Sequence, residues 1–549
     1  MKLDQEILYG TDNTDAIFEG IKRSVKAVSV TLGPKGDTVI IKRPTGPIKV
    51  TKDGVSVVRE IFGATDEEDI GCAMIRSVAS ITDESAGDGT TTASILAYAI
   101  IEAGRKMVAA GISPNEIRKG INKAVELAVK YLNDWKIDIA GEQKKIRQVA
   151  AISANNDPDL GNLVAEAFEK VDANGIISIQ ASPTSKSYVE VVDGMRFNRG
   201  FIDSQFANNE NMTEAVFKEP FILITDGVLT SWEDIGPYAV AASDKKRPLV
   251  IIAEDVKDEA LNMLIMNVSQ GKMEGCAIRA PFTNDAKRDF LIDISIATGA
   301  FFFDESRGTS TKAAGKDLKT QQIIDAFGEA DRMEINSGTS TIIEGRGDAP
   351  VIKKRIDQIQ DFLDKNSNDY ESDVLRTRLA KMASNVGVIF VGAPSEAERD
   401  EIVDRVVDAK RATQAAIEEG YLPGGGVTFI ELQEVLYDNE QLRQDCSDEQ
   451  WAGVEIFRKA LSIPLKTMLV NADLEDQVII HQIRKSKAKY FGMDIRTGKT
   501  GNMVKMGIID PKKVLESIIR NAASIAVLAL TSKCSVIIKE EPRGGATLF

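Results

Sequence analysis

The sequence predicts an α/β protein of several domains, in which two helical outer parts enclose a central part built from strands and helices. The chain has 549 residues, of which 43% are hydrophobic, so it is long enough to bury more than one core. Apolar residues recur at helical spacing over 15–30, 91–108 and 114–135. The centre carries short apolar runs typical of buried strands, such as 221–224 and 249–252, each followed by a helix-like segment.

The composition argues against several classes of function. The net charge of −15, with no basic, aromatic-rich patch to offset it, disfavours a nucleic-acid binder. The four cysteines stand far apart and His481 is the only histidine, which disfavours a zinc site or a nucleophile activated by histidine. The first residues contain no apolar signal-peptide core, and we find no run of about 18 apolar residues that would span a membrane. We therefore expect a cytoplasmic protein with neither nucleic-acid nor membrane partners.

The most informative motif is the segment 86–93, Ala-Gly-Asp-Gly-Thr-Thr-Thr-Ala, which leads into an apolar helical run. Glycines let the backbone approach a phosphate closely, the start of a helix offers free N–H groups, and Asp88 can hold a cation. The alternative is an ordinary helix N-cap, in which Asp88 bonds the donors of the first turn. On this segment alone, the N-cap is the favoured interpretation.

Three further glycine turns change that balance. The segment 30–36 closes an amphipathic helix with a turn suited to an anion, whereas 51–54 and 422–427 are ordinary turns when taken singly. In this order and at these separations, the motifs TLGPKG, TKDG, AGDGTTTA and PGGGV closely resemble the group I chaperonins, the GroEL type. The resemblance runs from about Tyr9 to about Ile538, with further matching blocks at 152–155, 192–195, 248–256, 405–409, 416–420 and 506–511.

The resemblance implies a chaperonin fold whose domains are partly discontinuous in sequence. The motifs lie before residue 93 and after residue 404, so the two outer parts of the chain must meet in space. Gly194 and Gly387 lie at the expected domain crossings and are predicted hinges, because glycine absorbs large changes of φ and ψ. The implied domains are an all-α equatorial ATPase domain (1–134 and 419–549), a small α/β intermediate domain (135–192 and 387–418) and an α/β apical substrate-binding domain (193–386).

The resemblance also implies an ATP-hydrolysing site that uses Mg²⁺ and K⁺. Asp408 would orient the attacking water at the γ-phosphate, with Asp53 as a second carboxylate near that water. Phosphoryl transfer needs such positioning and charge neutralisation, and little covalent work from the protein. Asp88 would hold Mg²⁺, and oxygens near Thr31 and Lys52 would hold K⁺. The residues predicted to bind ATP are Thr31, Leu32, Gly33, Pro34, Lys52, Asp88, Gly89, Thr90, Thr91, Thr92, Gly425, Asp494 and Asp510.

One departure from the family pattern touches this site. Where the family commonly has Asn followed by Ala near the base and ribose, this chain has Asp494 followed by Ile495. The Asp494 carboxylate can accept a hydrogen bond from an adenine amino group or a ribose hydroxyl, but it cannot donate one while ionised. The substitution therefore bears on nucleotide affinity.

The predicted client-binding surface lies in the apical part, because an unfolded client shares little with other clients except exposed apolar surface. Phe201 and Phe206 would contribute from an extended segment, and Leu261, Ile265 and Met266 from a helix. Apolar residues at helical spacing are also what a plain domain core requires. Without the resemblance, the core would be the favoured interpretation.

The helix expected around 232–240 departs most from the family. Gly236 and Ala239 stand where the family has leucines, and Val240 stands where it has a carboxylate. Tyr238 and Val240 are the two candidates for restoring the lost apolar contact. The segment 301–338 is also longer than the family norm, and the sequence alone gives no account of it.

The predicted function is an ATP-dependent chaperone that captures unfolded proteins and encloses them in a ring cavity for folding. A closed ring needs head-to-tail interfaces. The resemblance implies a heptameric ring, single or stacked in pairs, and leaves open the use of a GroES-type co-chaperonin. The altered apical helix motivates an alternative, a nucleotide-regulated holding or structural ring without enclosed folding. A small-molecule kinase is disfavoured because no Walker lysine motif is present.

Overall fold

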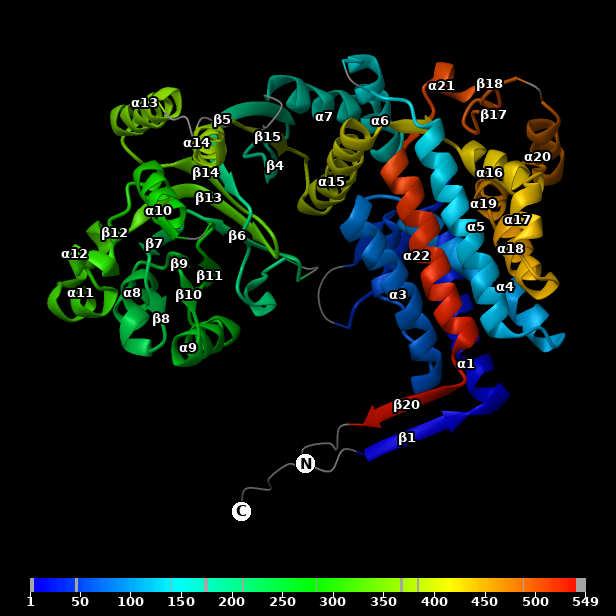
Figure 1. Cartoon of the computed structure of the whole chain (residues 1–549), viewed down its shortest axis with the longest axis horizontal. Coiled ribbons are helices and arrows are strands. Elements are labelled where there is room, and N and C mark those ends of the chain that lie inside the picture. Colours follow the sequence, from blue (N-terminus) through cyan, green and yellow to red (C-terminus); the bar gives the residue numbers. More distant parts are fainter. Residues whose placement is uncertain are drawn as a thin grey trace. The chain divides into compact units, whose positions relative to one another are not determined.

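The computed structural model describes residues 4–44, 48–139, 141–171, 176–209, 212–282, 284–365, 369–382, 385–486 and 488–539 (Figure 1). The chain divides into two compact units. Unit 1 contains Met1–Glu166, Ile179–Tyr188 and Phe390–Phe549, and unit 2 contains Ala167–Ser178 and Val189–Ile389. The first and last parts of the chain therefore meet in one body, as the sequence predicts. The finer division into three domains stays a prediction.

Unit 1 is mainly helical. Its helices are α1 (Gly10–Ser29), α2 (Gly54–Arg59), α3 (Asp66–Ala86), α4 (Thr90–Ala109), α5 (Pro114–Trp135), α6 (Gln143–Ser153), most of α7 (Pro158–Lys170), α15 (Glu396–Glu419), α16 (Val427–Tyr437), α17 (Glu440–Gln444), α18 (Asp448–Ala460), α19 (Ile463–Val470), α20 (Asp476–Lys485), α21 (Met503–Met506) and α22 (Lys512–Thr531). Its strands are short and form two-stranded pairs: β1 (Asp4–Tyr9) with β20 (Cys534–Lys539), β2 (Val39–Ile41) with β3 (Lys49–Thr51), β16 (Tyr421–Pro423) with β19 (Ile509–Pro511), and β17 (Phe491–Met493) with β18 (Thr500–Asn502).

The core of unit 1 forms where the long helices pack together. Helix α22 packs against α3, α4 and α5, and α5 packs against α18 (Figure 1). The approach of α5 to α18 requires glycine, because a Cβ atom on Gly120 would lie 1.8 Å from the Gln450 carbonyl oxygen and one on Gly453 would lie 2.2 Å from that of Ile117. The three helices predicted at the start of the chain are confirmed as α1, α4 and α5, the last with the predicted bounds.

In the part of the chain that the structure describes, one helix is long and apolar enough to span a membrane. Helix α22, Lys512–Thr531, is apolar and long enough, and half of its most apolar stretch is buried inside the structure. The expectation that no such segment exists was wrong by this measure. A core helix passes the same test, and the buried residues of α22 lie in the main core of unit 1.

Unit 2 is built on a large sheet in the order β11-β9-β7-β13-β14-β5-β15-β4, with β12 beside β7 and β6 beside β13. Its strands are β4 (Ile176–Ala181), β5 (Tyr188–Phe197), β6 (Glu214–Lys218), β7 (Phe221–Thr225), β8 (Val228–Leu229), β9 (Leu249–Ala253), β10 (Asp255–Val256), β11 (Gly275–Arg279), β12 (Phe302–Phe303), β13 (Gly328–Asn336), β14 (Ser340–Gly345) and β15 (Asn385–Val391), of which β4, β5 and β15 continue into unit 1. Its helices are α8 (Trp232–Asp244), α9 (Asp258–Ser269), α10 (Asn284–Thr298), α11 (Thr311–Asp317), α12 (Thr320–Asp325), α13 (Ala349–Lys365) and α14 (Asp369–Met382), with 3₁₀ turns η1 (Ser204–Phe206) and η2 (Glu305–Arg307).

Strands β7, β9 and β11 run parallel and are buried along almost their whole length. Parallel strands are covered on both faces, so their side chains form a continuous apolar run rather than an alternating one. This explains the runs that predicted strands at 221–224 and 249–252.

The long segment 301–338 folds into β12, η2, α11, α12 and β13. Helices α11 and α12 both pack against α8. Tyr238 of α8 is fully buried, and its hydroxyl donates a hydrogen bond to the Thr311 carbonyl at 3.0 Å. Lys312 and Lys316 of α11 each lie 3.0 Å from the Glu233 carboxylate. The segment therefore covers one side of α8, which gives it the structural role that the sequence did not reveal.

Candidate functional site

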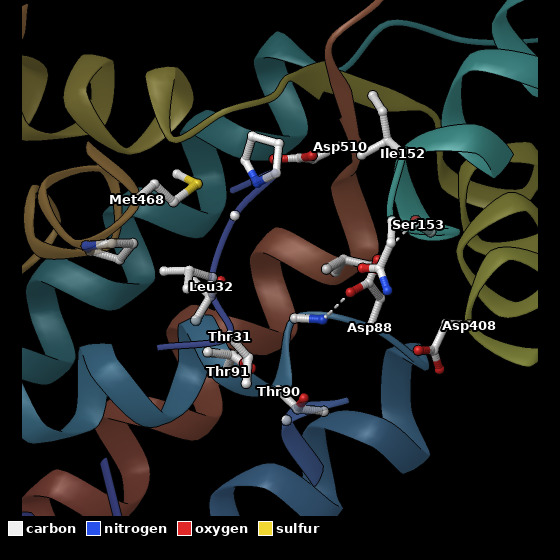
Figure 2. A pocket seen from close by; sticks show the side chains of 18 of the residues that line it. Thr31, Leu32, Asp88, Thr90, Thr91, Ile152, Ser153, Asp408, Met468 and Asp510 are labelled. Carbon is white, nitrogen blue, oxygen red and sulfur yellow. Dashed lines mark hydrogen bonds between the residues drawn. The ribbon is translucent and has the colours of Figure 1, made fainter. Parts of the chain in front are cut away.

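All the residues predicted at the ATP site line one cavity of about 260 Å³ in unit 1 (Figure 2). They come from the turn after α1, the turn before α2, the loop between α3 and α4, helix α15, the turn before α16, the loop after β17 and strand β19. The residues are Thr31, Leu32, Gly33, Pro34, Lys52, Asp53, Asp88, Gly89, Thr90, Thr91, Thr92, Asp408, Gly425, Asp494 and Asp510. Seven separate segments thus meet at one place.

The loop between α3 and α4 has the geometry of an anion-binding turn. Helix α3 ends at Ala86, Gly87 has φ 69° and Gly89 has φ 84°, and α4 begins at Thr90. Glycine adopts this left-handed conformation without steric cost, and the first N–H groups of α4 have no partner within their own helix. The loop therefore presents backbone donors at the positive end of a long helix dipole.

Two turns that precede this loop in the sequence, 30–36 and 51–54, contact the first turn of α4 and each other. A Cβ atom on Gly54 would lie 2.1 Å from Thr91 Oγ1, so only glycine lets α2 begin against the first turn of α4. The hydroxyl oxygens of Thr31 and Thr91 lie 3.4 Å apart. Lys52 Nζ donates to the Gly36 carbonyl at 2.9 Å, which connects the TKDG and TLGPKG motifs.

Asp88 lies in the loop with both carboxylate oxygens engaged (Figure 2). The Gly89 N–H donates to Oδ1 at 2.6 Å, and the Ser153 hydroxyl, at the end of α6, donates to Oδ2 at 2.8 Å. Burial raises the pKa of Asp88, and the nearby Asp53 and Asp83 raise it further, against the lowering effect of the two hydrogen bonds. The simple N-cap interpretation is incomplete, because Gly89, and not Asp88, occupies the N-cap position of α4.

Two more buried carboxylates, those of Asp408 and Asp510, line the same cavity, and the pKa of each is raised. Burial, then the nearby charges of Asp53 and Asp88, raise the pKa of Asp408 well above its ordinary value. Burial, then Asp88, raise the pKa of Asp510 to about 7. Asp53 differs, because its side chain accepts N–H hydrogen bonds at the start of α2 as a helix cap. A cavity that crowds carboxylates in this way favours a bound cation.

Asp494 also has a structural role within its own loop, and its predicted role at the nucleotide stays a prediction. Its carboxylate accepts a hydrogen bond from the Arg496 N–H at 3.0 Å and another from the Thr497 hydroxyl at 2.8 Å. Both oxygens therefore hold the loop between β17 and β18, although the residue lines the cavity. Gly425, with φ 64°, lies just before α16, and Asp510 lies beside the same turn because β16 and β19 pair Leu422 with Asp510.

The sequence interpretation missed two residues that shape the site. Ser153 lies in a block that matches the family, but nothing in the pattern showed that its hydroxyl would bond Asp88. Asn471 donates from Nδ2 to the Ser29 carbonyl at 2.9 Å and to the Leu32 carbonyl at 3.0 Å, and so fixes the TLGPKG turn. These contacts join residues far apart in sequence, and no local signal reveals them.

A metal site made only of protein side chains is absent from the part of the chain that the structure describes. No three His, Cys, Asp or Glu side chains come together there in a way that could hold an ion. A cation at Asp88 would therefore need oxygen ligands from a bound phosphate or from water, as Mg²⁺ commonly does at nucleotide sites.

The predicted client-binding residues differ in how much of each side chain is exposed to solvent. Met266 of α9 is 41% exposed, while Leu261 and Ile265 are partly buried against the core of unit 2. Phe201 is also partly buried, and it forms an isolated bridge with Ile278 of β11. The prediction for Phe206 was wrong, because this side chain is 1% exposed and belongs to the core of unit 2.

On α8, the candidates for restoring the lost leucine contacts also differ. Val240 is 56% exposed and remains available at the surface. Tyr238 is fully buried beneath α11, so it packs in the interior. The indole of Trp232 lies over Gly236, where a Cβ atom would come within 2.7 Å of Nε1.

The predicted hinge glycines lie inside strands. Gly194 is in β5 and pairs with Ile343 of β14, and Gly387 is in β15. Neither has a positive φ. The chain passes between the two units at 188–189 and 389–390, close to both glycines in sequence. Their role as hinges stays a prediction.

Comparison with known proteins identifies the family. A sequence model of the TCP-1/cpn60 chaperonin family matches residues 25–542. The chain belongs to this family. The prediction of a chaperonin, made from the four turn motifs, is confirmed.

Solved structures agree with the fold of this chaperonin. One similar structure is the crystal structure of the chaperonin gp146 from the bacteriophage EL 2 (Pseudomonas aeruginosa) in the presence of ATP-BeFx. It matches with a TM-score of 0.65 and 20% sequence identity over 98% of this chain and 99% of that chain. A second crystal form matches with a TM-score of 0.61 at the same identity and coverage. The predicted chaperonin fold is thereby confirmed.

Proposed function

We propose that this chaperonin binds and hydrolyses ATP in the cavity of unit 1 and uses the cycle to fold client proteins. The observation that carries the proposal is the meeting of separate glycine turns and several carboxylates in one cavity. Phosphates would bind to the N–H groups at the start of α4 and to the hydroxyls of Thr90 and Thr91, which line that cavity. The two gp146 structures are described as in the presence of ATP-BeFx, which supports a nucleotide as the ligand here.

Asp88 is the residue best placed to hold Mg²⁺ together with phosphate oxygens. Its carboxylate is already oriented by Ser153 and Gly89, which is how supporting groups fix a metal ligand. Bound Mg²⁺ would supply charge neutralisation for the phosphates and for the crowded carboxylates. Oxygens near Thr31 and Lys52 are proposed to hold K⁺, and Thr31 is a largely buried polar residue of the cavity wall.

Asp408 is proposed to orient the attacking water, and Asp53 to assist. Asp408 projects from α15, a different element from the phosphate loop, so it approaches the cavity from another side (Figure 2). Its raised pKa makes the carboxylate a better proton acceptor from water than an ordinary aspartate. Nucleotide binding does not need this group, so binding and hydrolysis should be separable.

Client capture is proposed for the apolar side chains that unit 2 leaves exposed, among them Met266 and Val240. Unfolded chains offer apolar surface without a fixed shape, and flexible methionine adapts to such partners. Enclosure of the client during the cycle, with or without a GroES-type co-chaperonin, is part of the proposal.

Assembly into a ring is supported by the strand pairs of unit 1. The β2–β3 pair exposes Ile40, at 70%, and Val50, and the β1–β20 pair exposes Ile7 and Val536. Two-stranded ribbons are marginally stable alone, and apolar strand edges are normally covered by another chain or element. We propose that these ribbons contact neighbouring subunits in a heptameric ring.

Native mass measurement of the Ile40→Lys variant should show assemblies smaller than those of the unmodified chain. A ring of unchanged mass would show that the β2–β3 ribbon is not part of the interface.

The test of the whole proposal is refolding of a denatured, aggregation-prone enzyme with Mg-ATP in K⁺ buffer, with and without a co-chaperonin, while phosphate release is followed. Recovery without the co-chaperonin indicates a self-sufficient folding ring. Recovery only with it supports a lid-dependent cycle. Hydrolysis without recovery in either case contradicts the proposed folding function.

A second candidate is a nucleotide-regulated holding or structural ring. It is favoured by α8, whose Gly236 and Ala239 are small and buried and whose Tyr238 is covered by α11. This helix therefore offers less apolar surface than a chaperonin with leucines at both positions. Prevention of aggregation without ATP-stimulated recovery would support this alternative.

A further inference from the structure

Helix α15 carries a second residue that contacts the phosphate loop. Arg411 lies one turn after Asp408 on this helix. Its Nη1 donates a hydrogen bond to Asp83 Oδ1 at 2.7 Å, close to the end of α3. The pair joins segments 328 positions apart in the sequence. It therefore fixes the helix that holds Asp408 against the helix that leads into the phosphate loop.

The stem of Arg411 also packs directly on that loop. A Cβ atom on Gly87 would lie 2.2 Å from the Cβ of Arg411 and 2.3 Å from its Cδ. The arginine stem thus occupies the space that any other side chain at this position would need. Gly87 immediately precedes Asp88, so the arginine covers the part of the loop that presents the proposed metal ligand.

Asp83 connects to the three elements that bring Asp53, Asp88 and Asp408 to the cavity. Its carboxylate receives Arg411 from α15, the helix of Asp408. Arg59, the last residue of α2, lies 3.9 Å away, and α2 begins at the Asp53 cap. Its backbone carbonyl accepts the Gly87 N–H at 2.8 Å, which ends α3 just before Asp88. Asp83 therefore fixes the positions of these three elements relative to one another.

An ordinary surface ion pair is the competing interpretation, and such pairs contribute little. Here the Asp83 side chain is only 13% exposed, and Arg411 is 36% exposed. Another ion pair from the same helix, between Asp404 and Lys49, spans 3.9 Å. The Arg411–Asp83 contact is shorter and its carboxylate is less exposed than that of Asp404, and packing of the stem on Gly87 restricts it further.

We propose that the Arg411–Asp83 pair positions Asp408 for hydrolysis by holding α15 over the phosphate loop. Arg411 is a positioning residue, because it acts through the placement of Asp408. The proposal rests on the proposed hydrolytic function and adds a determinant of its rate. Loss of the pair lets α15 shift relative to the loop, which lowers the turnover rate and leaves nucleotide binding to the glycine turns intact.

The test is a double-mutant cycle with Arg411→Gln, Asp83→Asn and the double variant, all as full-length chains. Each single variant should lower kcat roughly five-fold, and the double variant should be no slower than either single one, since the pair acts as a unit. ADP affinity should stay within about two-fold and Arg411→Lys should recover part of the rate. Arg399→Ala is the matched control, because its ion pairs join residues of α15 only.

Additive losses in the cycle, or an unchanged kcat in both single variants, would overturn the proposal. Loss of ADP affinity together with a lower melting temperature would show a purely structural role and would also overturn it. Hydrogen exchange of peptides from 396–419 gives a readout that does not need hydrolysis. If the unmodified chain hydrolyses no ATP, the proposed function fails. Hydrogen exchange still shows whether the pair holds α15 in place: exchange that rises equally in both single variants and the double variant supports this, and unchanged exchange contradicts it.

Discussion

The residues that line the cavity of unit 1 can be predicted from the sequence more reliably than the residues exposed on the apolar surface of unit 2. Every residue predicted at the ATP site lines one cavity, whereas the five residues predicted to bind clients range from fully buried Phe206 to exposed Met266. Phosphate-binding turns depend on glycine, threonine and aspartate within a few positions, so the motif carries its own geometry. An apolar side chain has no such local geometry, because the same residue serves a core or a binding surface according to what covers it.

The sharpest test of the cavity is Asp408→Ala. Loss of the group that orients water should lower the hydrolysis rate by about 10³-fold, within the range of general-base effects, while ATP affinity changes little. The measurement is phosphate release under saturating Mg-ATP, with affinity measured separately by calorimetry.

Asp400→Ala is the matched control, because this aspartate lies on the same helix and is largely exposed. It should leave both quantities within about two-fold, as expected for a solvated surface charge. If Asp408→Ala instead abolished binding and Asp400→Ala did not, Asp408 would be a binding residue and its assignment to water would be wrong.

The features that can be predicted from the sequence are those that depend on local contacts. The four turn motifs identified the family, and helical spacing placed α1, α4 and α5, because both signals lie within short segments. Ser153 and Asn471 were missed because each bonds a residue that is distant in sequence. The covering of Tyr238 by α11 was likewise invisible, since it depends on how segment 301–338 folds against α8.

For unit 2, Phe206→Ala tests whether this residue is core or surface. Removing a fully buried phenylalanine should cost about 3–4 kcal/mol of unfolding free energy, through lost apolar burial and the cavity left behind. Urea unfolding of unit 2, followed by hydrogen exchange of its peptides, measures the loss. The neighbouring Gln205 is exposed, so Gln205→Ala should have almost no effect. Equal stability of both variants, with weaker client capture in Phe206→Ala, would return Phe206 to the binding surface.

The pH dependence of stability tests whether the cavity of unit 1 holds a buried carboxyl, Asp510, in its protonated form. The pKa of Asp510 is raised to about 7 from an ordinary 3.8, so the folded protein holds a proton that the unfolded chain has lost. Its contribution favours folding below about pH 4 and is lost as pH rises from about 4 to about 7. A shift of this size corresponds to at most about 4 kcal/mol at pH 8, and burial of the asparagine amide offsets part of it. In the nucleotide-free protein, Asp510→Asn should therefore raise stability at pH 8 by about 1–2 kcal/mol and reduce the slope between pH 4 and 7.

Thermal unfolding of nucleotide-free protein across this pH range measures the effect. The control is Asp473→Asn, which changes an exposed aspartate outside the cavity, at a backbone conformation that asparagine also adopts. Equal pH slopes for Asp510→Asn and the unmodified chain would mean that the cavity does not hold this carboxyl in its protonated form.

The smallest expected effect is on client capture by the exposed side of α9. Met266→Ser removes one apolar side chain that is already 41% exposed, so the melting temperature should barely change. Burial of a methionine against a client contributes on the order of 1 kcal/mol, so binding of a denatured client should weaken roughly five-fold. Asn262→Ser is the control, because it changes an exposed polar residue of the same helix. Client affinity that falls for Met266→Ser alone would assign Met266 to the client-binding surface of unit 2, and equal affinity for both variants would place the client elsewhere.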